Sequence, residues 1–167
     1  MAQTKLDENI VNTNGSLPAV GSMAPDFLLT GSDLKEVKLR DFAGSFIILN
    51  IFPSVDTRVC ATSVREFNKR AAALPETVVI NVSKDLPYAF KRFCAAEGID
   101  KILSTSDFRD KGSFSKNYGV EMVDGRMWGL YARAIVVIDK QGKVIHTELV
   151  PLIGQEPNYD AAIQTMK

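Results

Sequence analysis

Two nearly continuous apolar runs, separated by a segment long enough for one helix, constrain the fold of this chain more than any other feature. Residues 46–52 and 77–82 are rich in β-branched and aromatic side chains, a pattern typical of strands buried on both faces. The apolar residues between them recur at intervals of four or three, which predicts a helix with one apolar face: Cys60, Val64, Phe67, Ala71 and Leu74. We expect this helix to begin between Thr57 and Cys60 and to stop at Pro75. A strand, a helix and a second strand in this order indicate a parallel crossover.

The rest of the chain adds a second helix and an antiparallel edge. Residues 86–97 predict a helix with Asp85 as its N-cap and Gly98 as its C-cap. Residues 134–138 and 143–149 indicate two strands joined by a tight turn. Weaker elements are also expected: a small hairpin within residues 1–15, a short strand within 21–40, another at 102–106 and a closing helix at 158–166. This order predicts an α/β protein with a thioredoxin-like fold, in which helices flank a central mixed sheet, as a single domain over residues 1–167.

Composition and charge narrow the classes of partner. Twenty Lys and Arg residues balance twenty Asp and Glu residues, and no basic cluster is present, which argues against a nucleic-acid or membrane-surface protein. The longest apolar run is too short to span a bilayer, and the N-terminus lacks the pattern of a secretory signal. We therefore expect a soluble, cytoplasmic protein. Two cysteines and one histidine are too few for a tetrahedral zinc site, so we expect neither a metal nor another cofactor.

The segment from Pro53 to Cys60 leaves the first buried strand and enters the first helix, a place where active sites gather in α/β proteins. A cysteine in the first turn of a helix meets the positive end of the helix dipole and free backbone N–H groups, which favour the thiolate. A thiolate is the species that attacks an O–O bond, so a peroxide is one possible substrate here. Thr57 lies one turn before Cys60, so its hydroxyl can face the sulfur and accept a hydrogen bond from a peroxide. Pro53 has no N–H and can pack over the sulfur, and a distant arginine would complete the site.

Each of these residues also has a purely structural interpretation. Cys60 can simply be buried, because free cysteine is often a core residue. The same holds for Cys94, the other cysteine, which lies in the second predicted helix. Thr57 can act only as a helix cap, and Pro53 can only end a strand. His146 lies in the middle of a predicted strand and is expected to be structural, which leaves no histidine base for Cys60 and disfavours a papain-like hydrolase.

Pro53, Thr57 and Cys60 resemble the peroxiredoxin pattern of proline, threonine and cysteine at these spacings. The flanking sequences extend the similarity from about Pro18 to near the C-terminus. The stretches that carry it are 24–27, 37–44, 50–57, 63–65 and 67–68. The similarity to the bacterial thiol peroxidase subfamily, the atypical two-cysteine type, rests on residues 52–57 with Cys60, on 63–65 and on 67–68.

The resemblance implies a peroxidase that reduces hydrogen peroxide and alkyl hydroperoxides. Cys60 would be the peroxidatic cysteine, which is oxidised to a sulfenic acid, and Arg133 would be the active-site arginine, although a surface ion pair is its structural alternative. Cys94 would be the resolving cysteine, which forms an intrasubunit disulfide with Cys60 that thioredoxin then reduces. The subfamily also implies a homodimer.

Two other functions suit the same fold. A thiol–disulfide oxidoreductase usually carries Cys-x-x-Cys, and Cys60 has no such partner. A redox sensor or relay would use the same chemistry at Cys60 and pass the oxidation to a partner, so the sequence leaves it open. A disulfide needs Cα atoms within ~7 Å of each other, and both cysteines are expected on helices. We therefore predict that forming the disulfide requires local unwinding around Cys60 and around Cys94.

Overall fold

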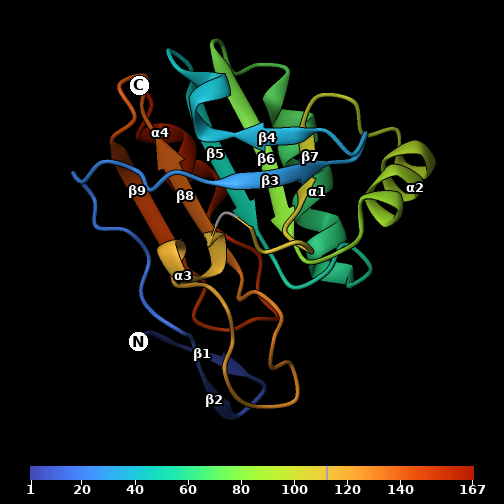
Figure 1. Cartoon of the computed structure of the whole chain (residues 1–167), viewed down its shortest axis with the longest axis vertical. Helices are drawn as coiled ribbons and strands as arrows, with labels where there is room; N and C mark the ends of the chain where they lie inside the picture. The colour runs from blue at the N-terminus through green and yellow to red at the C-terminus, as the bar shows by residue number, and fades with distance from the viewer. Residues whose placement is uncertain (112) are drawn as a thin grey trace.

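The two apolar runs form neighbouring parallel strands at the centre of the sheet. In the computed structural model, which describes residues 1–111 and 113–167, these strands are β5 (Phe46–Ile51) and β6 (Thr77–Ser83). The helix α1 (Arg58–Ala71) connects them. The sheet has seven strands in the order β4-β3-β7-β6-β5-β8-β9, in which β6 also pairs in parallel with β7 (Leu103–Ser106) and the other pairs are antiparallel (Figure 1). The predicted mixed sheet flanked by helices is confirmed.

The remaining elements form a separate two-stranded sheet, β1-β2, the rest of the seven-stranded sheet and its covering layers. They are β1 (Gln3–Leu6), β2 (Asn9–Asn12), β3 (Leu28–Gly31), β4 (Glu36–Lys38), the 3-10 helix η1 (Leu39–Phe42), α2 (Pro87–Glu97), α3 (Phe114–Tyr118), β8 (Ala134–Ile138), β9 (Val144–Leu149) and α4 (Tyr159–Gln164). The N-terminal hairpin, the second helix with its left-handed Gly98 cap, the β8–β9 hairpin and the closing helix are all confirmed. The first helix ends at Ala71, one turn before Pro75.

Two sequence predictions differ from the structure. Residues 21–40 hold two antiparallel strands, β3 and β4, where one short strand was expected. The prediction that Asp85 caps α2 is wrong, because Leu86 occupies the N-cap position and no side chain in the described ranges caps this helix end. The Asp85 carboxylate instead accepts hydrogen bonds from Ser54 and Val55 in the loop that follows β5, about 30 residues earlier in the chain.

The sheet separates two apolar layers, because successive side chains of a strand point to opposite faces. Ile47, Leu49 and Ile51 of β5 pack in one cluster with Phe114 and Tyr118. On the opposite face two further clusters lie under the helices. One contains Ile48, Phe67, Val79, Ile135, Val137, Tyr159 and Ala162, and the other contains Phe52, Val55, Cys60, Ala61, Val64, Phe90 and Phe93. The second of these clusters brings the start of α1 against α2.

The β1–β2 hairpin lies at one end of the molecule, beside the long loop that precedes β8 (Figure 1). Val11 of the hairpin is buried with Met122, Ala132 and Ile153. The Asp124 carboxylate accepts hydrogen bonds from the backbone and the side chain of Asn12 at 2.9 and 2.6 Å. The hairpin therefore fixes the loop that leads to Arg133.

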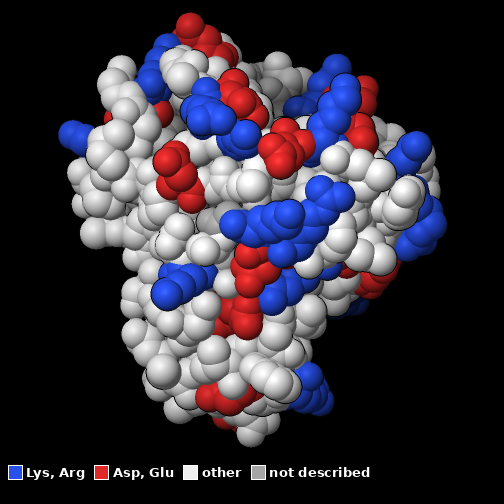
Figure 2. All heavy atoms as spheres, viewed as in Figure 1, with Lys and Arg blue, Asp and Glu red and all other residues white. Residues whose placement is uncertain are grey.

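Basic and acidic side chains lie next to one another over the face shown in Figure 2. This mixture agrees with the equal numbers of positive and negative residues in the sequence. No helix within residues 1–111 and 113–167 is long and apolar enough to cross a membrane.

Candidate active site

Cys60 is fully buried in the first turn of α1. Thr57 is the N-cap, and the first backbone hydrogen bond of the helix runs from Ala61 N to Thr57 O at 2.9 Å. Helix geometry therefore leaves the N–H groups of Arg58, Val59 and Cys60 without a carbonyl partner one turn back. These donors and the helix dipole create a positive environment at the sulfur.

Arg133 places its guanidinium against this sulfur. Its Nη2 lies 3.3 Å from Cys60 Sγ, and its Nε donates to the carbonyl oxygen of Ile153 at 3.0 Å. The sheet explains the approach, because Ala134 at the start of β8 is the register partner of Ile51 at the end of β5. Arg133 is only 2% exposed, and its Nη1 has no hydrogen-bond partner among the described residues. Arg133 therefore presents a buried guanidinium N–H to the cysteine sulfur.

Thr57 and Pro53 lie in the loop between β5 and α1. The Thr57 hydroxyl donates to Ser54 O at 3.0 Å, which uses its proton and leaves its oxygen lone pairs able to accept. Its side chain does not cap the helix, although the residue occupies the cap position. Thr57 is exposed and Pro53 is buried, so an acceptor at the surface and an apolar ring inside both flank the cysteine turn.

Asp85 fastens this loop to the end of β6, and sequence reasoning missed this role. Its carboxylate accepts from Ser54 Oγ at 2.7 Å and from Val55 N at 2.8 Å, and it also accepts from Ser83 Oγ. The bonds join two chain segments that lie 30 residues apart. Their effect is to fix the backbone immediately before the helix that carries Cys60.

Cys94 lies on α2, half-buried beside the same apolar cluster as Cys60. Both cysteines are free thiols in this structure. Cys94 Sγ lies 3.5 Å from Ser104 Oγ on β7. Burial raises the pKa of the Cys94 thiol, and the hydrogen bond with Ser104 acts in the opposite direction.

A buried pair, Tyr131 and Asp107, was also missed by the sequence analysis. Tyr131 lies two residues before Arg133. The Tyr131 hydroxyl donates to the Asp107 carboxylate, and both residues are almost fully buried. Burial raises the pKa of Asp107 to about 6, although the Tyr131 hydrogen bond opposes the rise. Burial, with the charge of Asp107, also raises the pKa of Tyr131. Lys84 packs over the tyrosine ring and pairs with Glu121 at 2.8 Å.

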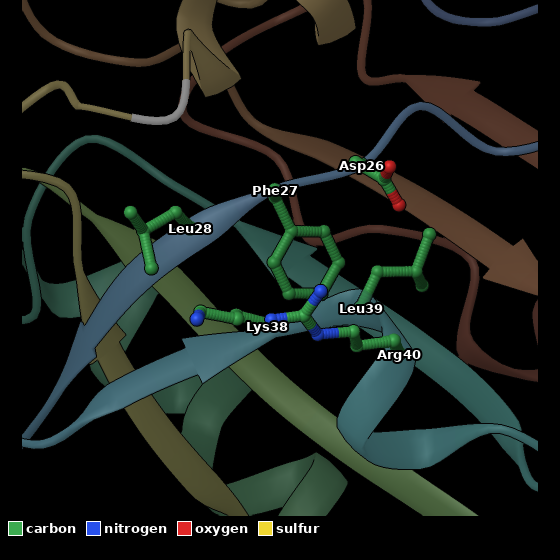
Figure 3. A pocket seen from close by; sticks show the side chains of 6 residues that line it. All are labelled: Asp26, Phe27, Leu28, Lys38, Leu39 and Arg40. Carbon is green, nitrogen blue, oxygen red and sulfur yellow. The ribbon is translucent and has the colours of Figure 1, made fainter.

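A separate pocket lies beside β3, β4 and η1 (Figure 3). It is lined by Asp26, Phe27, Leu28, Lys38, Leu39 and Arg40. Neither cysteine contributes to it, so it is distinct from the thiol site. Across the two described ranges, no group of three His, Cys, Asp or Glu side chains is placed to hold a metal ion.

A buried cysteine at a helix start, next to an arginine and within a thioredoxin-like sheet, defines a class of thiol redox proteins. The Redoxin family pattern matches residues 19–163. The chain therefore belongs to the Redoxin family, as the sequence resemblance indicated.

Relatives within this family specify the activity. The chain is 58% identical to a thiol peroxidase of Mycobacterium tuberculosis over 99% of both chains, and 47% identical to a thiol peroxidase of Corynebacterium glutamicum over 99% of both. Its structure matches a peroxiredoxin-like protein from Aquifex aeolicus with a TM-score of 0.91 and 36% identity, over 98% of this chain and 95% of the other. The protein is a thiol-dependent peroxidase, which uses a peroxide substrate and a thiol reductant.

Proposed function

We propose that Cys60 is the nucleophile of this peroxidase. Its thiolate sulfur attacks one peroxide oxygen and the O–O bond breaks. The products are a Cys60 sulfenic acid and hydroxide or alkoxide, which takes up a proton to give water or an alcohol. The observation that carries the proposal is the 3.3 Å contact between Arg133 Nη2 and Cys60 Sγ, two residues that are both buried.

Three further residues take roles around this reaction. Arg133 stabilises the thiolate through Nη2, and its Nη1, which has no partner within the described part of the chain, is available to the charge that develops on the leaving oxygen. The Thr57 oxygen accepts a hydrogen bond from the peroxide and so orients it. Pro53 shields the sulfur from bulk water, and its burial supports this role.

Cys94 is proposed as the resolving cysteine. It borders the cluster that contains Cys60, so the two cysteines, on α2 and α1, adjoin one apolar cluster. Its sulfur attacks the Cys60 sulfenic acid and forms an intrasubunit disulfide, which thioredoxin reduces. Preference for organic hydroperoxides, a homodimer and a cytoplasmic location stay predictions from the resemblance. A redox relay is not favoured, because the relatives are named as peroxidases.

One equivalent of cumene hydroperoxide, followed by thiol labelling and intact non-reducing mass measurement, tests this scheme. The expected product is a monomer-mass species that has lost both thiols. Cys60→Ser should not react, and Cys94→Ser should lose one thiol and stop at a trappable sulfenic acid. Peroxide turnover that survives in Cys60→Ser would refute the assignment of the nucleophile. A covalent dimer, or loss of only one thiol in the unmodified sequence, would refute the role of Cys94.

A further inference from the structure

A row of buried polar side chains crosses three strands of the sheet. Asn50 on β5, Asn81 on β6 and Ser104 on β7 are direct register partners. They are 0%, 0% and 4% exposed, respectively. Burying polar groups is unfavourable unless they are hydrogen-bonded, so the partners of this polar row indicate what it does.

The polar row runs in one direction toward Cys94. Asn50 Nδ2 donates to Asn81 Oδ1 at 3.0 Å, and Asn81 Nδ2 donates to Ser104 Oγ at 3.1 Å. Ser104 Oγ then lies 3.5 Å from Cys94 Sγ. Since the serine oxygen already accepts from Asn81, its own proton is free to point at the sulfur.

This direction matters because a thiolate has no proton and needs a donor. A hydroxyl that donates to an ionised sulfur forms a charge-assisted hydrogen bond, which is stronger than a bond to the neutral thiol. The Asn81 amide occupies one acceptor position of the Ser104 hydroxyl, and Asn50 in turn holds the Asn81 amide. Ser104 Oγ is therefore placed where it can donate to the ionised form of Cys94.

We propose that Ser104, held by Asn81 and Asn50, is a positioning residue that places the Cys94 sulfur and favours its thiolate for the resolving step. The proposal rests on the assignment of Cys94 as the resolving cysteine. In that step the Cys94 thiolate forms a bond to the Cys60 sulfur, and the S–O bond of the sulfenic acid breaks. Hydroxide leaves with the electron pair of that bond and takes up a proton to form water.

The charged groups on α2, Lys91, Arg92 and Glu97, and those before β7, Asp100 and Lys101, are exposed. On α1, Arg58, Arg65 and Lys69 are exposed, and Glu66 and Arg70 are half-buried. Arg65 pairs with Glu97 at 2.8 Å, and Arg92 pairs with Asp56 at 3.3 Å. The two influences on the pKa of Cys94 are burial, which raises it, and the Ser104 hydrogen bond, which lowers it.

The test compares Ser104→Ala with Ser106→Ala. Ser106 is a buried serine on the same strand whose hydroxyl accepts from Phe108 N and touches neither cysteine. Rapid mixing with cumene hydroperoxide measures first the oxidation of Cys60 and then disulfide formation, each across a range of pH. In Ser104→Ala we expect the first step to be unchanged, and a rise of about one unit in the pKa that governs the second step.

The pH profile separates this role from a structural one. A more basic thiolate is scarcer below its pKa but more nucleophilic once formed, so disulfide formation should be about three- to fourfold slower at low pH and about threefold faster at high pH. A merely destabilised variant would not make the two profiles cross. Ser106→Ala should match the unmodified protein throughout.

A second measurement reads the contact directly and does not depend on the resolving step. In a Cys60→Ser background Cys94 is the sole thiol, and its thiolate can be titrated by ultraviolet absorbance or by the rate of alkylation. Adding Ser104→Ala should raise the Cys94 pKa, while adding Ser106→Ala should not. An unchanged pKa would overturn the proposal even if Cys94 resolves the sulfenic acid. If the pKa rises in this background but the unmodified sequence forms no Cys60–Cys94 disulfide with peroxide, the proposed function is refuted. The contact between Ser104 and Cys94 would then be established without a catalytic role.

Discussion

Replacing Arg133 is the sharpest test of how this site reacts with peroxide. The guanidinium contacts Cys60 Sγ through Nη2 at 3.3 Å and Ile153 O through Nε at 3.0 Å. In Arg133→Lys a single ammonium cannot reproduce this fork, since the two bonds leave different nitrogens of a planar group. Arg133→Gln removes the charge altogether but keeps one N–H₂ donor.

The expected size of the effect follows from these contacts. A hydrogen bond to a charged group contributes about 1.5–3 kcal/mol, which corresponds to a rate change of about 10- to 150-fold. Arg133→Lys should therefore slow Cys60 oxidation by about tenfold or more. Arg133→Gln should slow it by at least about 100-fold, because the charge opposite both the thiolate and the leaving oxygen is lost.

Single-turnover mixing of reduced protein with cumene hydroperoxide, followed by loss of the Cys60 thiol, measures this rate. Arg70→Gln is the matched control, because Arg70 pairs with Asp160 at the surface, away from either cysteine. Circular dichroism and urea unfolding show whether the Arg133 variants remain folded. A folded Arg133→Gln protein that reacts within about threefold of the unmodified rate would refute the electrostatic role of the arginine.

Three further predictions concern stability and motion. Burial raises the pKa of Asp107 to about 6. Between about pH 4 and pH 6 the folded protein therefore holds a proton on Asp107 that the unfolded chain has released. The free energy of unfolding should fall by about 1–2 kcal/mol as the pH rises through this range. Urea unfolding across that range checks the fall, and Asp107→Asn should flatten it; equal slopes would contradict the cause. Phe67→Ala should cost about 3–5 kcal/mol, because Phe67 is fully buried against the Tyr159 ring; a loss below about 1 kcal/mol in urea unfolding would show that the site collapses. Because disulfide formation is predicted to unwind the helix segments around Cys60 and Cys94, hydrogen exchange there should be faster in the disulfide form. Equally slow exchange in both redox forms would contradict the predicted unwinding.

The central part of the fold could be predicted from sequence because its signals are local and long. Three signals each extend over several residues with one hydrophobic pattern: the apolar runs that form β5 and β6, and the apolar face of α1. The elements β3, β4 and α3 have only three to five residues each, too few to show a period. Asp85 was misassigned because an aspartate before a helix usually caps it, whereas here donors that lie 30 residues away in the sequence compete for the carboxylate.

The site was predictable in its residue types and not in its contacts. The spacing of Pro53, Thr57 and Cys60 lies within one loop and one helical turn, so the sequence shows it directly. The Arg133 geometry depends on the Ile153 carbonyl, and no side chain marks a backbone acceptor in advance. The polar row did leave a signal, because Asn50 and Asn81 each occupy the fifth position of an apolar run. Because Phe46 pairs with Thr77 in the parallel register of β5 and β6, the two fifth positions become neighbours.

The polar row also bears on where α1 can unwind. Asn50 Nδ2 donates to Ser63 Oγ at 3.3 Å, and Ser63 donates to Cys60 O at 2.9 Å. Beyond Ser63 the helix is anchored by the fully buried Val64 and Phe67. The turn that contains Cys60 has weaker backbone support, since its N–H groups lack partners one turn back. Opening to meet Cys94 should therefore stop at Ser63, so that only the cysteine turn is lost while the apolar face of α1 stays packed on the sheet.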